Sequence, residues 1–121
     1  MNKSEAIAIA NASLQEQRLN EANTQFSQIV NYAGVEGWWL NIPLPNFRRE
    51  NHLLICSEKA RVIRHLMIKS QQILSPATKF RVKNGVADIF IPAANPKKLV
   101  DQLEGGSKYS FTKHIVDEHR F

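Results

Sequence analysis

The dipeptide Asn84-Gly85 constrains the fold of this chain more than any other feature. It lies between "TKFRVK" and "VADIFIP", two runs in which apolar and polar residues alternate. Asn-Gly is typical of the two-residue turn of a β-hairpin, because both turn positions need a positive φ. The turn also fixes the register of the two strands. The predicted cross-strand partners are Arg81 with Asp88, Lys83 with Val86, and Lys79 with Phe90.

Two more segments are predicted to be strands. In residues 38–44, "WWLNIPL", alternating apolar residues would place Trp38 and Trp39 on opposite faces. Pro43 lacks the N–H that a central strand donates, so this strand is predicted to lie at a sheet edge or to end early. Residues 52–56, "HLLIC", are continuously apolar, as in a short buried strand. Tyr109, Phe111 and Ile115 indicate a last strand near the C-terminus.

Three segments are predicted to be helices. The first covers residues 4–33, with Ser4 as N-cap, Gly34 as stop and a kink or break near residues 15–18. Its clearest apolar stripe is Leu19, Ala22, Phe26, Ile29 and Ala33. The second covers residues 57–74 and ends before a proline, and the third covers residues 95–105, beginning at Asn-Pro and ending at Gly-Gly.

These elements predict an α+β fold in a single domain, residues 1–121. A helical segment, residues 1–33, would precede a sheet with two helices, residues 37–121. The long N-terminal helix and the two shorter helices would pack on a small, mainly antiparallel sheet of three to five strands. The hydrophobic content of 43% and charged content of 22% are typical of a globular chain with its own core. The length and low charge of the first helix favour a homodimer formed through it.

The cysteine count and the apolar runs bear on the compartment. Cys56 is the only cysteine, which excludes an internal disulfide and favours a reducing cytoplasm. The longest apolar runs, such as residues 6–10, hold about five residues, too few to span a membrane. Glu5 interrupts the N-terminal segment, which differs in this respect from a secretion signal. We predict a cytoplasmic protein without a membrane partner.

The positive charge is concentrated in the middle of the chain. The net charge is +5, and residues 46–83 alone hold nine basic and two acidic residues. Residues 1–45 carry a net charge of −2, and residues 84–121 are balanced. A basic segment of this kind favours a polyanionic partner, either nucleic acid or an acidic protein surface. The alternative is that these side chains only keep the protein in solution.

Nucleic-acid binding is the first functional hypothesis. On the predicted hairpin, Lys79, Arg81 and Lys83 would alternate along one strand about 7 Å apart, near the spacing of successive phosphates. Phe90 would offer a ring on which a base can stack. The alternative to nucleic-acid binding is that Arg81 simply pairs with Asp88 across the two strands. The predicted nucleic-acid-binding residues are Arg48, Arg49, Arg61, Arg64, Lys69, Lys79, Arg81, Lys83 and Phe90.

A protein-interaction module is the second hypothesis, such as an inhibitor or adaptor encoded by a mobile element. Trp39 and Phe47 beside Arg48 and Arg49 would form an aromatic and cationic patch of the kind that dominates protein interfaces. Burial of Trp39 beneath the first helix is the alternative. The third hypothesis is a small-ligand pocket near Trp38 and Trp39.

The sequence contains no recognisable catalytic or metal-binding motif, so we predict a non-enzymatic protein without a cofactor. It lacks G-x-S-x-G, a phosphate loop and paired carboxylates. The segment "HIVDEH" holds two histidines and two acids, but His114 and His119 share neither a helix face nor a strand face. Cys56 follows apolar residues and is predicted to be a core residue rather than a nucleophile.

Overall fold

The computed structural model describes all residues of the chain, 1–121, and its framework is one seven-stranded sheet. The strands are β1 (Thr24–Tyr32), β2 (Val35–Pro43), β3 (Asn51–Ser57), β4 (Val62–Ile68), β5 (Arg81–Lys83), β6 (Val86–Pro92) and β7 (Ile115–Arg120). The helices are α1 (Lys3–Leu14) and α2 (Pro76–Lys79), with 3-10 turns η1 (Leu44–Arg48) and η2 (Thr112–His114). The strand order is β5-β6-β2-β1-β3-β4-β7, and only the β1–β3 pair is parallel.

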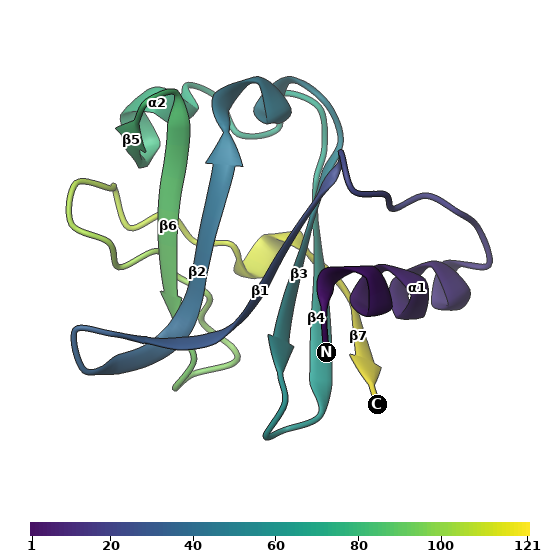
Figure 1. The fold of residues 1–121 in the computed structure, drawn as a ribbon. Coiled ribbons are helices and arrows are strands. Elements are labelled where there is room, and N and C mark those ends of the chain that lie inside the picture. The colour runs from purple at the N-terminus through teal and green to yellow at the C-terminus, as the bar shows by residue number, and fades with distance from the viewer.

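β1 divides the sheet into two halves. Its first part, residues 24–28, pairs with β3, and its last part, residues 29–32, pairs with β2. The strand runs obliquely between its two neighbours, and the sheet curls about it (Figure 1). One half, β5-β6-β2, therefore lies opposite the other, β3-β4-β7, and side chains fill the space between them.

Two hydrophobic clusters cover the two faces of the curled sheet. The larger cluster lies between the halves and includes Leu40 of β2, Leu53 of β3 and Ile89 of β6. Trp38 belongs to this cluster, and its indole Nε1 donates a hydrogen bond to the Cys56 carbonyl oxygen at 2.9 Å. The smaller cluster lies on the opposite face of β3 and β4, where α1 covers the sheet (Figure 1). β3 is therefore buried on both faces, as its continuous apolar sequence predicts.

The loop that follows α1, residues 15–23, is held to the helix by a buried side chain. Asn11 donates from Nδ2 to the Leu19 carbonyl oxygen and accepts from the Leu19 N–H at Oδ1, each at 2.9 Å. These two bonds place Leu19 in the smaller cluster. At its start α1 has a capping box between Asn2 and Glu5, so Asn2 rather than Ser4 is the N-cap.

Replacing Asn11 with alanine is expected to lower the free energy of unfolding by about 2 kcal/mol, because both backbone groups of Leu19 lose their buried partners. Arg18→Ala in the same loop removes an ion pair with Glu50 that is exposed to solvent, and we expect a much smaller loss. Urea denaturation measures both variants. Equal losses would show that Asn11 does not hold the loop.

The predicted hairpin at Asn84-Gly85 is confirmed with two of its three predicted pairs, whereas Lys79 lies in α2 and does not pair with Phe90. Arg81 pairs with Asp88 and Lys83 with Val86, and both turn residues have positive φ. The strands predicted at residues 38–44 and 52–56 correspond to β2 and β3. β2 lies between β1 and β6 rather than at an edge, and Pro43 is its last residue, so the prediction of an early end holds.

The predicted fold class is wrong. The protein is mostly β-sheet, with seven strands instead of three to five, one main helix and the four-residue α2. The helix predicted over residues 4–33 ends at Leu14, and residues 24–32 form β1. In β1, Phe26 contacts the smaller cluster and Ile29 the larger one, so a spacing that resembles a helical stripe arises from two opposite sheet faces. Gly34, predicted as a helix stop, belongs to the β1–β2 turn.

β4 occupies the centre of the second predicted helix, residues 57–74. Ile63 and Leu66 would share a helix face, yet they lie on opposite faces of β4 and both are fully buried. A strand that is covered on both faces loses the alternation by which a strand is recognised. The third predicted helix, residues 95–105, is a turn followed by an extended loop. Asn95 does accept from the Lys97 N–H at 3.0 Å, so its capping chemistry forms a turn only.

α1 has only 12 residues, so the long first helix through which a homodimer is predicted does not form. No helix of the structure combines the length and apolar character required to cross a membrane.

Candidate functional site

The predicted nucleic-acid-binding cations are distributed over both halves of the sheet. They divide into three groups: Arg48, Arg49 and Lys69 where β3 begins and β4 ends, Arg61 and Arg64 at the start of β4, and Lys79, Arg81 and Lys83 at the β5 edge. The first two groups lie at opposite ends of β4, about 20 Å apart for a strand of this length. A polyanion that contacts the first two groups must therefore extend along the length of β4.

Two predicted surface aromatics are buried. Phe90 is 3% exposed and lies opposite Trp39 of β2, not beside Lys79, which is the last residue of α2. It therefore cannot present its ring to a base. Phe47 is also buried and stacks on Phe80 in the larger cluster, with 5.7 Å between the ring centroids. The predicted patch of Trp39 and Phe47 with Arg48 and Arg49 is not assembled.

Trp39 instead belongs to an aromatic cluster on the outer face of β1, β2 and β6. The ring centroid of Tyr32 lies 5.2 Å from that of Trp39 and 5.2 Å from that of Phe90, and the last two are 6.4 Å apart. Tilted contacts at such distances are favourable between aromatic rings. Trp39 Nε1 donates to Asn41 Oδ1 at 2.9 Å, which fixes the orientation of the indole.

Gly37 makes room for this packing. A Cβ atom at this position would lie 2.7 Å from Phe90 Cζ and 2.4 Å from the Ile91 carbonyl oxygen. Both distances are closer than van der Waals contact, so the Phe90 ring can lie across β2 only over a glycine. Phe90 is thus the buried floor of the cluster, and Tyr32 and Trp39 form its surface.

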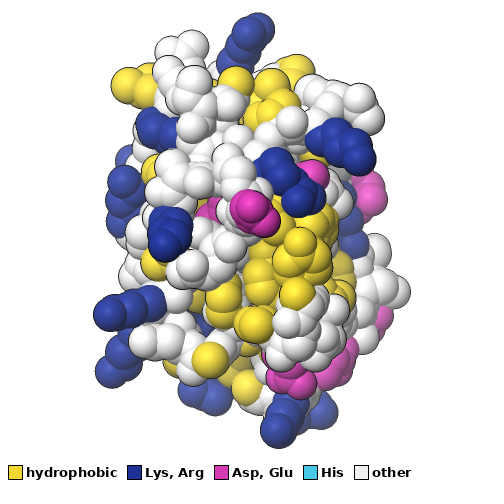
Figure 2. All heavy atoms as spheres, turned by 90° about the vertical axis from the view of Figure 1, so that its left-hand side faces the viewer, with side chains coloured by type: hydrophobic (Ala, Val, Ile, Leu, Met, Phe, Trp, Pro, Cys, Tyr) yellow, Lys and Arg dark blue, Asp and Glu magenta, His cyan; other side chains and the backbone are white.

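An apolar surface surrounds the cluster. We call the surface formed by Val30, Tyr32, Val35, Trp39 and Arg81 the aromatic face. Val30, Tyr32 and Val35 are 43%, 41% and 44% exposed, and Tyr32 and Val35 are direct cross-strand partners. The Arg81 guanidinium lies 5.6 Å from the Trp39 ring centroid, a cation–π distance. On the side where β5 and β6 lie, Figure 2 shows hydrophobic side chains gathered in one area with basic and acidic groups at its border.

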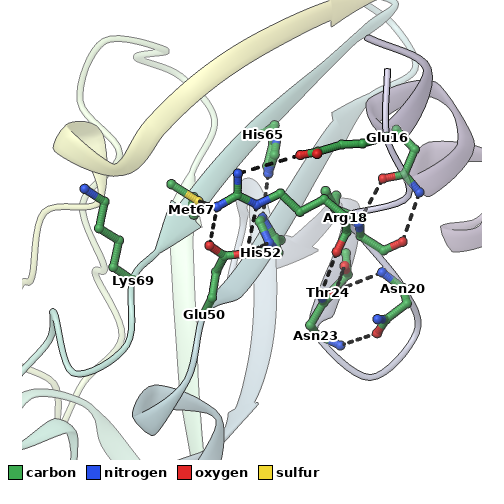
Figure 3. Close-up of polar contacts among 12 residues, drawn as sticks. Glu16, Arg18, Asn20, Asn23, Thr24, Glu50, His52, His65, Met67 and Lys69 are labelled. Atoms are coloured by element: carbon green, nitrogen blue, oxygen red, sulfur yellow. Dashed lines mark hydrogen bonds and ion pairs between the residues drawn. The ribbon is translucent and has the colours of Figure 1, made fainter. Parts of the chain in front are cut away.

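A network of polar side chains, which we call the histidine chain, links the loop of residues 15–23 to β3 and β4 (Figure 3). Arg18 forms a two-nitrogen ion pair with Glu50, and Glu50 Oε2 lies 3.0 Å from His52 Nε2. His52 Nδ1 lies 2.8 Å from His65 Nε2. Both histidines are buried. The histidine chain therefore extends from an exposed arginine to the buried interior beneath α1.

Charge determines the direction of these hydrogen bonds. The Arg18 guanidinium lowers the pKa of Glu50 to about 2, so Glu50 is an ionised acceptor. His52 then donates from Nε2 and, when neutral, accepts at Nδ1 from His65 Nε2–H. Burial lowers the pKa of His52, and burial together with His52 and His119 lowers the pKa of His65 to about 4. Both are neutral at pH 7, and His65 Nδ1 remains a buried atom without a partner.

β7 adds a third histidine to the same sheet face. The His119 ring stacks on His65 with 6.5 Å between centroids, and its Nε2 makes no hydrogen bond. Asp117, paired with His65 across the strands, accepts from Ser13 Oγ of α1 at 3.2 Å. None of the cavities is lined by these histidines, and no three such side chains are arranged to hold a metal ion. The chemistry that the histidine chain offers is proton uptake beneath α1 and its loop.

Sequence reasoning misses Tyr32 and the histidine chain. It places both Tyr32 and His65 inside predicted helices, residues 4–33 and 57–74. The signal that was available for the histidines is their position within apolar runs, "HLLIC" and "VIRHLMI". A polar side chain in such a run needs a buried partner, and each histidine supplies one for the other.

Comparisons with known proteins do not add to this geometry. No protein-family model, no curated protein and no solved structure matches the chain. The function is therefore inferred from the surfaces and cavities of the protein itself.

Proposed function

We propose that this chain is a non-enzymatic binding protein that docks a partner protein on the aromatic face. The observation that carries the proposal is the exposure of Val30, Tyr32 and Val35 beside Trp39 on adjacent strands. Single exposed apolar residues are common, whereas a contiguous patch is typical of an interaction site. Tryptophan, tyrosine and arginine are also the residues that most often dominate the energy of protein interfaces.

The charge of the aromatic face favours protein over nucleic acid. Arg81 and Lys83 lie on this side of β5, but Arg81 is paired with Asp88 at 3.2 Å, which leaves a net charge of +1. Tight binding of nucleic acid requires cations that neutralise several phosphates. A partner that presents apolar side chains next to a few carboxylates fits the face better, because its carboxylates would lie near Lys83 and Arg81.

Single-stranded nucleic acid is a second candidate, because Arg81 lies over the Trp39 ring and Tyr32 is exposed beside it. Single-strand binding surfaces stack bases on aromatic rings and hold the backbone with cations. This candidate requires that oligonucleotide binding depends on Trp39 and weakens steeply as the salt concentration rises.

Selection of peptides from a random display library separates the two candidates. The library is first depleted on the support without protein and is then selected on the wild type. The proposal predicts enriched peptides that combine apolar residues with Asp or Glu. Oligothymidine is titrated in parallel at low and moderate salt. Salt-dependent oligothymidine binding through Trp39, with no enriched peptide, would contradict the proposal and support the second candidate.

Trp39→Ser is expected to weaken the binding of a selected peptide by about tenfold or more, because a central tryptophan typically contributes at least about 2 kcal/mol to an interface. Leu74→Ser is the matched control, since Leu74 is a 65% exposed apolar residue outside the aromatic face. Calorimetric titration measures both affinities, and circular dichroism verifies that both variants are folded. Equal affinities of the wild type and Trp39→Ser would place the binding site elsewhere.

A further inference from the structure

A cavity of about 250 Å³ opens between the two halves of the sheet, at the end where β3 finishes and β4 begins. Apolar side chains form its walls, with Ile29 of β1 and Trp38 of β2 on one side and Ile55 of β3 and Val62 of β4 on the other. Its rim is charged, since Arg64 of β4 and Glu118 and Arg120 of β7 also line it. The cavity lies on the inner face of the sheet and is separate from the aromatic face.

Arg64 occupies an uncommon position for an arginine. It belongs to the row of β4 residues that faces the larger cluster, between Val62 and Leu66, and its side chain is only 18% exposed. A charge on a core-facing row needs partners that compensate for lost hydration. Arg64 Nε donates to Glu118 Oε2 at 3.3 Å, but neither Nη atom makes a hydrogen bond within the protein. The outer part of the guanidinium is therefore free to bind.

The guanidinium N–H groups at this rim that have no partner within the protein can bind an anion. Glu118 is already engaged by two arginines, with Oε2 on Arg64 and Oε1 on Arg120 at 3.5 Å. The two guanidinium groups outnumber the single carboxylate, so a cationic ligand would meet a net positive rim. The planar donors of a guanidinium match the two oxygens of a carboxylate, which they bind in parallel.

We propose that this cavity binds a small organic acid, with its carboxylate on Arg64 and its apolar part against Trp38 and Ile55. The volume is below the range of about 300–1,000 Å³ that is usual for drug-sized ligands, so the apolar part is a single ring or a short branched chain. This inference is independent of the function proposed for the aromatic face.

Cyclohexanecarboxylate is a suitable probe, because it combines a single apolar ring with a carboxylate and does not absorb where tryptophan does. A Trp39→Phe background leaves Trp38 as the only tryptophan. The expected result is a saturable change in Trp38 fluorescence, with a dissociation constant on the order of 1 mM or below. Cyclohexylmethanol and cyclohexylmethylammonium, which have the same ring without the negative charge, are expected to bind at least about tenfold more weakly.

Arg64→Gln is expected to weaken binding of the probe by about tenfold or more, because the charge-assisted hydrogen bonds are lost. Arg61→Gln is the matched control, an arginine on the preceding turn that does not line the cavity. Ala60→Leu narrows the cavity from an exposed position, keeps both rim arginines, and is also expected to weaken binding.

Equal affinity for the acid and the alcohol would overturn the proposal. So would inorganic phosphate that binds as tightly as the probe, or unchanged affinity in both Arg64→Gln and Ala60→Leu.

Discussion

Lowering the pH from 6.5 to 4 is expected to lower the free energy of unfolding by about 3 kcal/mol through His65 alone. The pKa of His65 is about 4 in the folded protein, against its usual 6.5, because burial and the neighbouring His52 and His119 oppose its protonation. As the pH falls, the unfolded chain binds this proton before the folded protein does. The contribution of the neutral His65 to the free energy of unfolding is therefore complete above pH 6.5 and is lost progressively as the pH falls toward 4.

The geometry of the histidine chain explains why protonation opposes folding. His52 and His65 share one hydrogen bond, with 2.8 Å between their nitrogens, which requires that one of them accepts. Two imidazolium rings have no free acceptor and cannot keep this contact. Once both carry a charge, they repel each other beneath the loop of residues 15–23, where Arg18 pairs with Glu50.

Other ionisable groups also change the free energy of unfolding as the pH falls, some lowering it and one raising it. Burial also lowers the pKa of His52 and His114, so both add to the loss in stability as the pH falls. Glu50, with a pKa of about 2, adds a loss that begins as the pH falls below 4.5. Asp101 acts in the opposite direction, because burial raises its pKa and its protonation favours the folded state. A difference between two variants therefore isolates His65 better than one curve does.

Urea denaturation of the wild type and of His65→Gln between pH 6.5 and 4 makes this comparison. Glutamine does not titrate and can still donate a hydrogen bond to His52 Nδ1. We expect the wild type to lose about 3 kcal/mol more than His65→Gln over this range. Parallel curves would show that His65 is not the acid-sensitive group.

Gly37→Ala is expected to lower the free energy of unfolding by about 3 kcal/mol, at the upper end of the usual cost of inserting a methyl group into a packed site. The new Cβ would meet Phe90 Cζ at 2.7 Å and the Ile91 carbonyl oxygen at 2.4 Å. The Ile91 oxygen belongs to the β6 backbone, which pairs with β2, so it cannot move without breaking the ladder. Thermal unfolding followed by circular dichroism measures the effect.

Gly34→Asn is the matched control for this prediction. Gly34 has a φ of +84° in the β1–β2 turn, and nothing lies within 4 Å of a Cβ built there. Asparagine tolerates a positive φ better than most residues, so the substitution is expected to cost much less than Gly37→Ala. Similar losses at both glycines would mean that the position of the Phe90 ring does not depend on space at Gly37.

The part of the fold that can be predicted from the sequence is the part that local rules decide. Asn84-Gly85 forms its turn with the register that its φ requirements impose, and β3 is recognised as buried from its continuous apolar residues. β1 and β4 are not recognised, because Phe26 and Ile29, like Ile63 and Leu66, are buried on opposite faces. Burial on both faces depends on α1 and on the second half of the sheet, which no local pattern reports.

The features of the candidate site also divide into those that local rules predict and those that depend on tertiary packing. Trp39 is predicted to point away from Trp38, and it does, because alternation along a strand is local. The burial of Phe90 is not predictable in this way, since it depends on the pairing of β6 with β2 and on the space above Gly37. The separation of Arg61 and Arg64 from Lys69 is not predicted, because β4, which extends between these positions, is predicted as a helix.

Backbone amide NMR of the ¹⁵N-labelled protein, titrated with a peptide selected on the wild type, would show whether that peptide binds at the aromatic face. We expect chemical-shift changes in residues 30–41 and 81–90, which carry the aromatic face and its border, and unchanged signals in α1 and β7. Changes confined to α1, β7 or residues 44–49, with the signals of Tyr32 and Trp39 unmoved, would contradict this expectation.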